Sequence, residues 1–144
     1  MAGYSGTPLA KKLGIKDDTK IFLLNAPKGY MKLVAPLPDR VKVVSQITRD
    51  TDIVQIFSTK KIQLTEVLRV SLGKLKKDGI IWVTWPKKSS KVPTDITEDT
   101  IRGVALPLGL VDIKVCAIDD VWSALKLVIR KEYRNSKETI HNKK

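Results

Sequence analysis

A loop rich in lysine and serine, enclosed by two prolines, holds the side chains of this sequence best suited to bind a ligand. It follows the apolar stretch 80–85 and ends at Asp95, which with Glu98 forms a helix-start signal. Ammonium and hydroxyl groups donate hydrogen bonds to oxyanions. The loop holds three lysines and two serines, and we expect Lys87, Lys88, Ser89 and Ser90 to bind the anion. The pattern predicts an anion-binding loop between a strand and a helix.

Ligands of open α/β sheets bind in the crevice beyond the carboxyl ends of the strands, which is where this loop should lie. Trp85 ends the preceding strand, where its ring could stack on a base or cover a pocket. The segment 25–30 follows an earlier apolar strand in the same way. We therefore expect one ligand site, formed by Asn25, Lys28, Trp85, Lys87, Lys88, Ser89, Ser90 and Asp95. The alternative is a solvated loop, with Asp95 as the N-cap of the helix that starts near Ile96.

The sequence offers little for other kinds of chemistry. Its one histidine, His141, lies near the C-terminus in a polar stretch, which argues against Ser-His-Asp, Cys-His and two-histidine metal sites. Its one cysteine, Cys116, can form no disulfide within the chain and no zinc-thiolate cluster. We expect Cys116 to be an inert buried thiol. No catalytic motif and no metal site is predicted.

Composition indicates an ordinary globular protein with excess positive charge. The 144 residues are 42% hydrophobic and 29% charged, with a net charge of +12, which favours anionic partners. The lysines are spread along the chain, so a solvated basic surface is favoured over specific nucleic-acid binding. No stretch approaches the about 20 apolar residues of a membrane span, and no secretory signal is visible. We expect a cytoplasmic protein that does not enter membranes and whose oligomeric state is open.

The order of apolar strands and amphipathic helices predicts a Rossmann-like α/β fold. It is a three-layer sandwich with a mostly parallel sheet and a C-terminal antiparallel strand pair. We expect one domain over residues 1–132 and a basic, flexible tail over 133–144. The expected helices cover 7–14, 30–35, 60–76 and 96–108, and the expected strands cover 21–24, 41–44, 53–57, 80–85, 111–115 and 122–129.

This element order resembles a shortened class I methyltransferase. The lead-in Leu13–Lys16 and the turn Leu75–Gly79 are similar to segments that precede the first and middle strands of that family. The resemblance implies S-adenosylmethionine as the cofactor. The amino-acid sequences of four segments resemble those of a small bacterial family of unknown function. These segments are Ser5–Leu9, Trp82–Asp95, Gly109–Cys116 and Asp120–Ser123.

Three features of a working methyltransferase are missing. The turn after the first strand, 25–29, has one glycine and a proline instead of several glycines. Ser45 and Gln46 follow the second strand, where a ribose-binding carboxylate is expected. Phe57–Lys60 replaces an acidic-aromatic Pro-Pro motif. An NADP site using Ser45 and Arg49 lacks the Gly-x-Gly-x-x-Gly turn.

These departures favour a non-catalytic, degenerate methyltransferase-like module, with no cofactor assigned. It would bind a small anionic or nucleotide ligand at the loop after the central strand. The first alternative is an active S-adenosylmethionine-dependent methyltransferase of unknown substrate. The second is a nucleic-acid or protein interaction module that uses the basic surface and the basic C-terminal residues.

Overall fold

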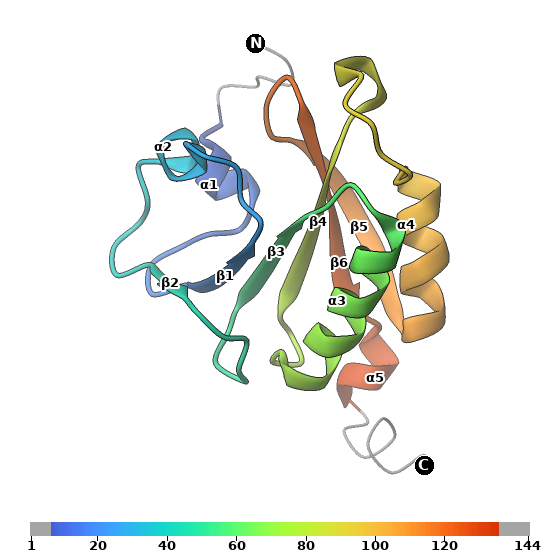
Figure 1. Ribbon diagram of the computed structural model, residues 1–144. Helices are drawn as coiled ribbons and strands as arrows, with labels where there is room; N and C mark the ends of the chain where they lie inside the picture. Colours follow the sequence, from blue (N-terminus) through green and yellow to red (C-terminus); the bar gives the residue numbers. More distant parts are fainter. Residues whose placement is uncertain (1–6, 136–144) are drawn as a thin grey trace.

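The computed structural model describes residues 7–135, with the side chains of residues 134 and 135 left aside (Figure 1). One mixed sheet runs through it in the order β2-β1-β3-β4-β6-β5. Four strands are parallel, β6 is antiparallel to β4, and β5 is antiparallel to β6. The strands are β1 (Lys20–Leu24), β2 (Lys42–Val44), β3 (Ile53–Phe57), β4 (Ile80–Pro86), β5 (Leu110–Ala117) and β6 (Trp122–Ile129). The expected α/β fold with a closing antiparallel pair is confirmed.

Helices cover both faces of the sheet. They are α1 (Leu9–Lys12), α2 (Tyr30–Val34), α3 (Lys61–Lys74), α4 (Glu98–Ala105) and α5 (Lys131–Asn135), with 3-10 turns η1 (Lys88–Ser90) and η2 (Leu106–Leu108). The helices α3 and α4 lie side by side on one face in Figure 1, and α1 and α2 lie on the other. Because β3 is covered on both faces, all five of its residues are buried.

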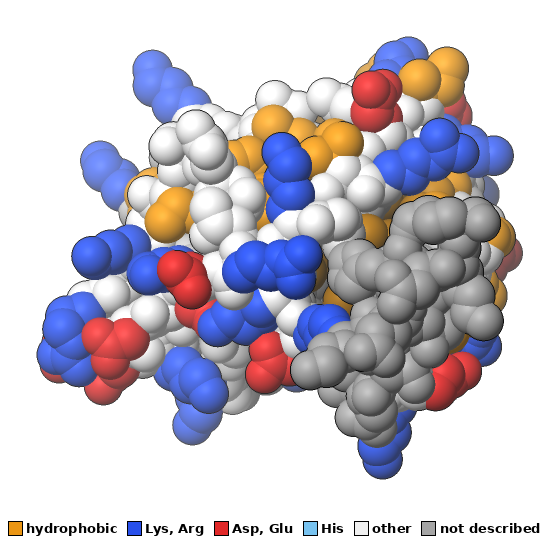
Figure 2. All heavy atoms as spheres, turned by 90° about the horizontal axis from the view of Figure 1, so that it is seen from below, with side chains coloured by type: hydrophobic (Ala, Val, Ile, Leu, Met, Phe, Trp, Pro, Cys, Tyr) orange, Lys and Arg blue, Asp and Glu red, His pale blue; other side chains and the backbone are white. Residues whose placement is uncertain are grey.

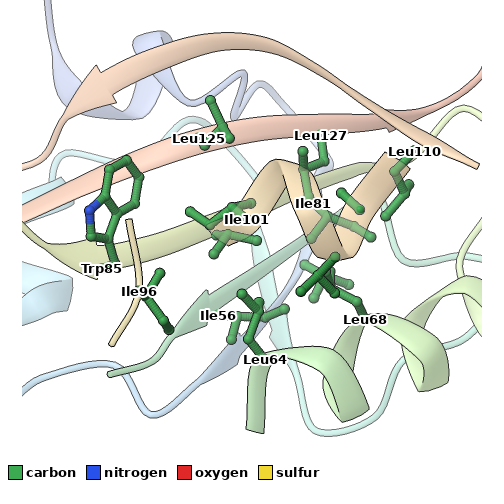
Figure 3. Close-up of a cluster of buried hydrophobic side chains, with 14 of the residues drawn as sticks. Ile56, Leu64, Leu68, Ile81, Trp85, Ile96, Ile101, Leu110, Leu125 and Leu127 are labelled. Atoms are coloured by element: carbon green, nitrogen blue, oxygen red, sulfur yellow. The ribbon is translucent and has the colours of Figure 1, made fainter. Parts of the chain in front are cut away.

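Alternation along the strands divides the core into two clusters. Trp85 faces α3 and α4 and packs near Ile96 and Leu125 (Figure 3). Trp82 faces α1, where its indole N–H donates to the carbonyl of Leu13 at 2.9 Å. The two tryptophans therefore point to opposite faces, as their spacing of three on a strand predicts.

Helix starts are where sequence signals and structure differ most. The first helix begins at Leu9, two residues after its expected start, with Pro8 as N-cap and no side-chain cap. The longest helix begins at Lys61, one residue after its expected start, with Lys60 as its N-cap residue. Thr97 caps α4 by accepting from the backbone N–H of Thr100, which leaves Asp95 outside that helix. Local sequence signals alone therefore do not place these helix starts.

The described part of the chain ends in the short helix α5. The expected boundary at residue 132 falls inside α5, whose Tyr133 packs against the α3/α4 core. The ring lies over Gly109, where an added Cβ would come within 2.6 Å of it. The basic tail beyond 135, including His141, lies outside the described residues. None of the described helices is long and apolar enough to cross a membrane.

Candidate ligand crevice

The strand order places a topological switch point between β1 and β3. From β1 the chain passes through α2 to β2 on one side, and from β3 it passes through α3 to β4 on the other. The two helices pack on opposite faces, because Tyr30 of α2 and Leu64 of α3 belong to different core clusters. Connections that diverge in this way open a crevice beyond the carboxyl ends of the strands. The site expected from the sequence combines Asn25 and Lys28, which follow β1, with residues of the loop after β4.

The loop 25–29 follows β1 at this switch point. Asn25 and Gly29 both have left-handed backbone conformations, with φ of 60° and 87°. The Asn25 side-chain amide donates to the carbonyl of Phe57 at the end of β3, in a long contact of 3.5 Å. Lys28 is exposed. Within residues 7–135, the backbone N–H groups of Lys28 and Gly29 donate to no protein acceptor, so both are available to a ligand.

Hydrogen bonds join the end of β3 to the end of β4 and to the loop that follows it. The backbone N–H of Ser58 donates to the carbonyl of Thr84 at 3.0 Å. The carbonyl of Thr59 accepts from the Thr94 hydroxyl at 2.8 Å and from the Asp95 N–H at 3.2 Å. The loop after β1 and the loop after β4 therefore both contact the end of β3, through Asn25 and Asp95 respectively.

Asp95 has a different role from the one its sequence position indicates. Its Oδ1 accepts a hydrogen bond from the backbone N–H of Lys61, at 2.7 Å. Asp95 therefore caps α3, which precedes it by 34 positions, and not α4, which follows it. A carboxylate at a helix N-terminus also offsets the positive end of the helix dipole. This end of α3 already holds an anion from the protein itself.

The lysine–serine loop lies beyond β4 and is largely closed on itself. The Lys87 N–H donates to the carbonyl of Val121 at 2.7 Å. The Ser90 hydroxyl donates to the Lys87 carbonyl at 2.7 Å and accepts from the Val92 N–H at 3.3 Å. Lys88 and Ser89 are exposed on η1. At the start of α4, Thr97 accepts from the Thr100 N–H, and the first turn carries the acidic residues Glu98 and Asp99.

Among the tryptophans, Trp122 rather than Trp85 reaches the carboxyl edge. The side chain of Trp85 is 7% exposed and is surrounded by core residues, so we leave it out of the site (Figure 3). Trp122 is half-buried and meets Phe57 edge to face, with ring centroids 5.3 Å apart. Trp122 starts a strand that runs antiparallel to β4, which brings the first residue of β6 to the end of β4. The antiparallel orientation of β6 is the signal from which Trp122 could have been placed at the carboxyl edge.

A buried polar chain holds the start of α2 to the sheet. The Tyr30 hydroxyl donates to Oε1 of Gln55 at 2.7 Å, and Nε2 of Gln55 donates to the Thr84 hydroxyl at 3.2 Å. All three side chains are buried, and burial raises the pKa of Tyr30 strongly. Because Tyr30 directly follows the crevice loop, this chain fixes where that loop ends. A glutamine inside an otherwise apolar strand was the sequence signal for it.

The opposite, amino edge of the sheet contains paired charges. A hollow of about 670 Å³ there is lined by charged residues that include Lys20, Asp50, Asp52 and Lys76. Lys76 forms an ion pair with Asp52. Basic and acidic side chains are interspersed on this underside in Figure 2. No group of three or more His, Cys, Asp or Glu suited to a metal ion occurs among the described residues.

Comparison with solved structures shows the class to which the fold belongs. An S-adenosylmethionine-dependent methyltransferase from Aquifex aeolicus matches with a TM-score of 0.56 at 11% identity, over 84% of this chain and 88% of that chain. The fibrillarin pre-rRNA processing protein of Methanococcus jannaschii matches with a TM-score of 0.52 at 16% identity, over 81% and 69%. The m1A22 tRNA methyltransferase of B. subtilis matches with a TM-score of 0.52 at 9% identity, over 94% and 70%.

The chain therefore has the Rossmann-like fold of class I methyltransferases. At these identities the comparisons show the fold alone. No protein-family model and no curated protein matches the sequence. The resemblance to a small bacterial family of unknown function thus stays a prediction, as does the ligand site.

Proposed function

We propose that this chain is a methyltransferase-like domain that binds S-adenosylmethionine, or its product S-adenosylhomocysteine, in the crevice between β1 and β3. The observation that carries the proposal is the switch point itself, where the amides of Lys28 and Gly29 are free. The methyltransferase-like fold supports the same ligand class. The proposal moves the site away from the loop after β4 that the sequence favoured.

The residues of the crevice fit part of such a ligand. The two free amides and the exposed Lys28 ammonium would receive the carboxylate of its amino-acid portion. Exposed Ser45 and Gln46 follow β2, where hydroxyl and amide groups would bond the ribose hydroxyls. A neutral serine binds such hydroxyls less strongly than a carboxylate does. We therefore expect weak binding.

When bound, S-adenosylmethionine supplies an electrophilic methyl group on a sulfonium. Transfer of that group can be accelerated by alignment of the two reactants, since holding them in reacting geometry removes much of the entropic barrier. The lack of a histidine between residues 7 and 135 is therefore no obstacle to this class of reaction. The residues of this chain would bind and orient the ligand.

Binding is tested by thermal shift and calorimetry with S-adenosylhomocysteine, S-adenosylmethionine, NADP and sulfate. We expect both S-adenosyl ligands to raise the melting temperature. Lys28→Glu should weaken S-adenosylhomocysteine binding about tenfold, or about 1.4 kcal/mol. The matched control Lys32→Glu, an exposed residue of α2, should not. Ser45→Asp should strengthen binding by adding the missing carboxylate.

Two outcomes would overturn this proposal. One is the absence of any shift with millimolar S-adenosyl ligands. The other is a shift only with sulfate or NADP that disappears in Lys87→Gln/Lys88→Gln, which would restore the small-anion site at the loop after β4.

A further inference from the structure

We infer that the carboxyl edge of the sheet binds single-stranded nucleic acid, with phosphates along a row of lysines and a base against Trp122. This deepens the proposed function by naming a substrate class. It rests on the proposed function only for the reaction that the bound nucleic acid would undergo, because binding of the nucleic acid itself needs no S-adenosyl ligand. The lysines, hereafter the carboxyl-edge lysines, are Lys28, Lys60, Lys61, Lys87, Lys88 and Lys91.

The two edges of the sheet differ in charge. The connecting segments at the amino edge (13–19, 35–41, 48–52, 75–79, 109 and 130) carry six basic and six acidic residues. Those at the carboxyl edge (25–29, 45–47, 58–60, 87–97 and 118–121) carry five basic and three acidic residues. Lys61, the first residue of α3, adds a sixth positive charge to the latter. Positive charge is therefore in excess where ligands of this fold class bind.

The ion pairs of the described residues lie away from the carboxyl edge. Those of Lys20, Arg40, Lys76 and Arg130 lie at the amino edge, and Arg102 of α4 pairs with Glu98 and Asp99 of its own helix and with Asp112 of β5. None of the carboxyl-edge lysines forms an ion pair within residues 7–135. Their ammonium groups are thus free to meet an external polyanion.

Two of the three carboxylates at the carboxyl edge accept hydrogen bonds from the backbone instead. Asp95 accepts from the N–H of Lys61, and Asp119 accepts from the N–H groups of Val121 and Trp122, at 2.9 and 2.8 Å. Each carboxylate is held in place by these bonds and does not reach a lysine ammonium. With three carboxylates against six lysines, the carboxyl edge keeps an excess of positive charge.

The lysines follow adjacent strands, so they form a row instead of a single pocket. They follow β1, β3 and β4, which are neighbours in the sheet, and strand spacing places the outer two about 10 Å apart. A row of point charges suits the repeating phosphates of a polynucleotide better than one small anion. Lysine is a compact charge without the planar fork of arginine, so we expect phosphate binding with little sequence preference.

Trp122 supplies the contact for a base. It pairs with Pro86 in the ladder between β4 and β6, beside the hydrogen bond that joins Lys87 to Val121. Its indole is half-buried, whereas Trp82 and Trp85 are buried. Base stacking on an aromatic ring beside a basic path is typical of single-strand binding, and bases paired in a duplex are not free to stack in this way. We therefore expect a preference for single strands.

The test measures binding of a fluorescent single-stranded RNA by anisotropy, without any S-adenosyl ligand, from 50 to 200 mM salt. Lys88→Gln/Lys91→Gln should weaken binding several-fold at 50 mM and reduce the slope of log K against log salt by about 1.4. The matched control Lys16→Gln/Lys74→Gln removes two exposed charges toward the amino edge and should change neither quantity. RNA should quench the accessible tryptophan fluorescence, which we assign to Trp122.

Four results would overturn the inference: no binding at 50 mM salt, equal losses in the two double variants, duplex RNA bound as tightly as single strands, or no quenching. Polyglutamate that binds with the same dependence on Lys88 and Lys91 would point to an acidic protein instead. S-adenosylhomocysteine binding should be unchanged in Lys88→Gln/Lys91→Gln, since these residues lie beyond β4. Failure of nucleic-acid binding is thereby distinguished from failure of the proposed function.

Discussion

The carboxylate of Asp95 caps the helix that begins at Lys61, through a 2.7 Å hydrogen bond to the Lys61 backbone N–H. This bond holds the loop after β4 against the start of α3. Together with the two bonds to the Thr59 carbonyl, it joins the ends of β3 and β4 into one structure. The shape of the carboxyl edge depends on this contact between distant parts of the chain.

Removing this cap should destabilise the fold. We expect Asp95→Ala to lower the free energy of unfolding by about 1 kcal/mol, because α3 loses a side-chain acceptor. Asp95→Asn should recover most of the loss, since asparagine also caps helices well. Urea unfolding measures both. Asp120→Ala, an exposed aspartate of the β5–β6 turn, is the control, and an equal loss there would contradict the capping role.

The buried chain from Tyr30 to Thr84 gives a second prediction. Tyr30→Phe should cost about 1–3 kcal/mol, because it leaves the buried carbonyl oxygen of Gln55 without a donor. Tyr30→Phe/Gln55→Leu should cost less than the sum of the two single variants, since both partners are then removed. Additive losses in denaturant unfolding would show that the two residues do not act together.

Acid should weaken the fold through paired carboxylates. The Arg102 guanidinium, which bonds Asp112 at 2.9 Å, lowers the pKa of that carboxyl. For Asp52, burial raises the pKa, but hydrogen bonds from Lys76 and the Lys20 N–H outweigh burial and lower it. Carboxyls with a depressed folded-state pKa stabilise above their unfolded value of about 3.9, and that stability is lost as the pH falls through the folded pKa.

We therefore expect the urea midpoint to decline below about pH 4. Asp112→Asn should be less stable than the parent at pH 7 and equally stable once the pH is below the folded pKa of Asp112. A gap between the two proteins that stays constant from pH 7 to pH 2 would rule out this account.

Cys116 should react slowly in the folded protein. Its side chain is 6% exposed, and burial raises the pKa of its thiol, although Lys12 and Lys114 act in the opposite direction. Since the thiolate is the reactive form, little of it is present and accessible at neutral pH. A colorimetric thiol reagent should label Cys116 only after denaturant is added. Rapid labelling of the native protein would show that this end of β5 opens readily.

Much of the fold could be predicted from residue patterns alone. The alternation of apolar strands with amphipathic helices indicated a mostly parallel sheet with helices on both faces, and the spacing of Trp82 and Trp85 indicated opposite sides of the sheet. These inferences succeed because burial is encoded by periodicity within a few residues. The hydrogen-bond partners of polar side chains could not be predicted in this way, because Asp95, Ser90 and Thr59 each had several candidate partners.

By itself, the sequence determined the class of the fold, its strands and its excess of lysine. Only the tertiary structure decided that the switch point lies between β1 and β3, that Asp95 serves a helix 34 positions earlier, and that Trp122 reaches the carboxyl edge in place of Trp85. The physical reason is that strand order and hydrogen-bond partners depend on how distant segments pack, whereas local patterns record only whether a side chain is buried.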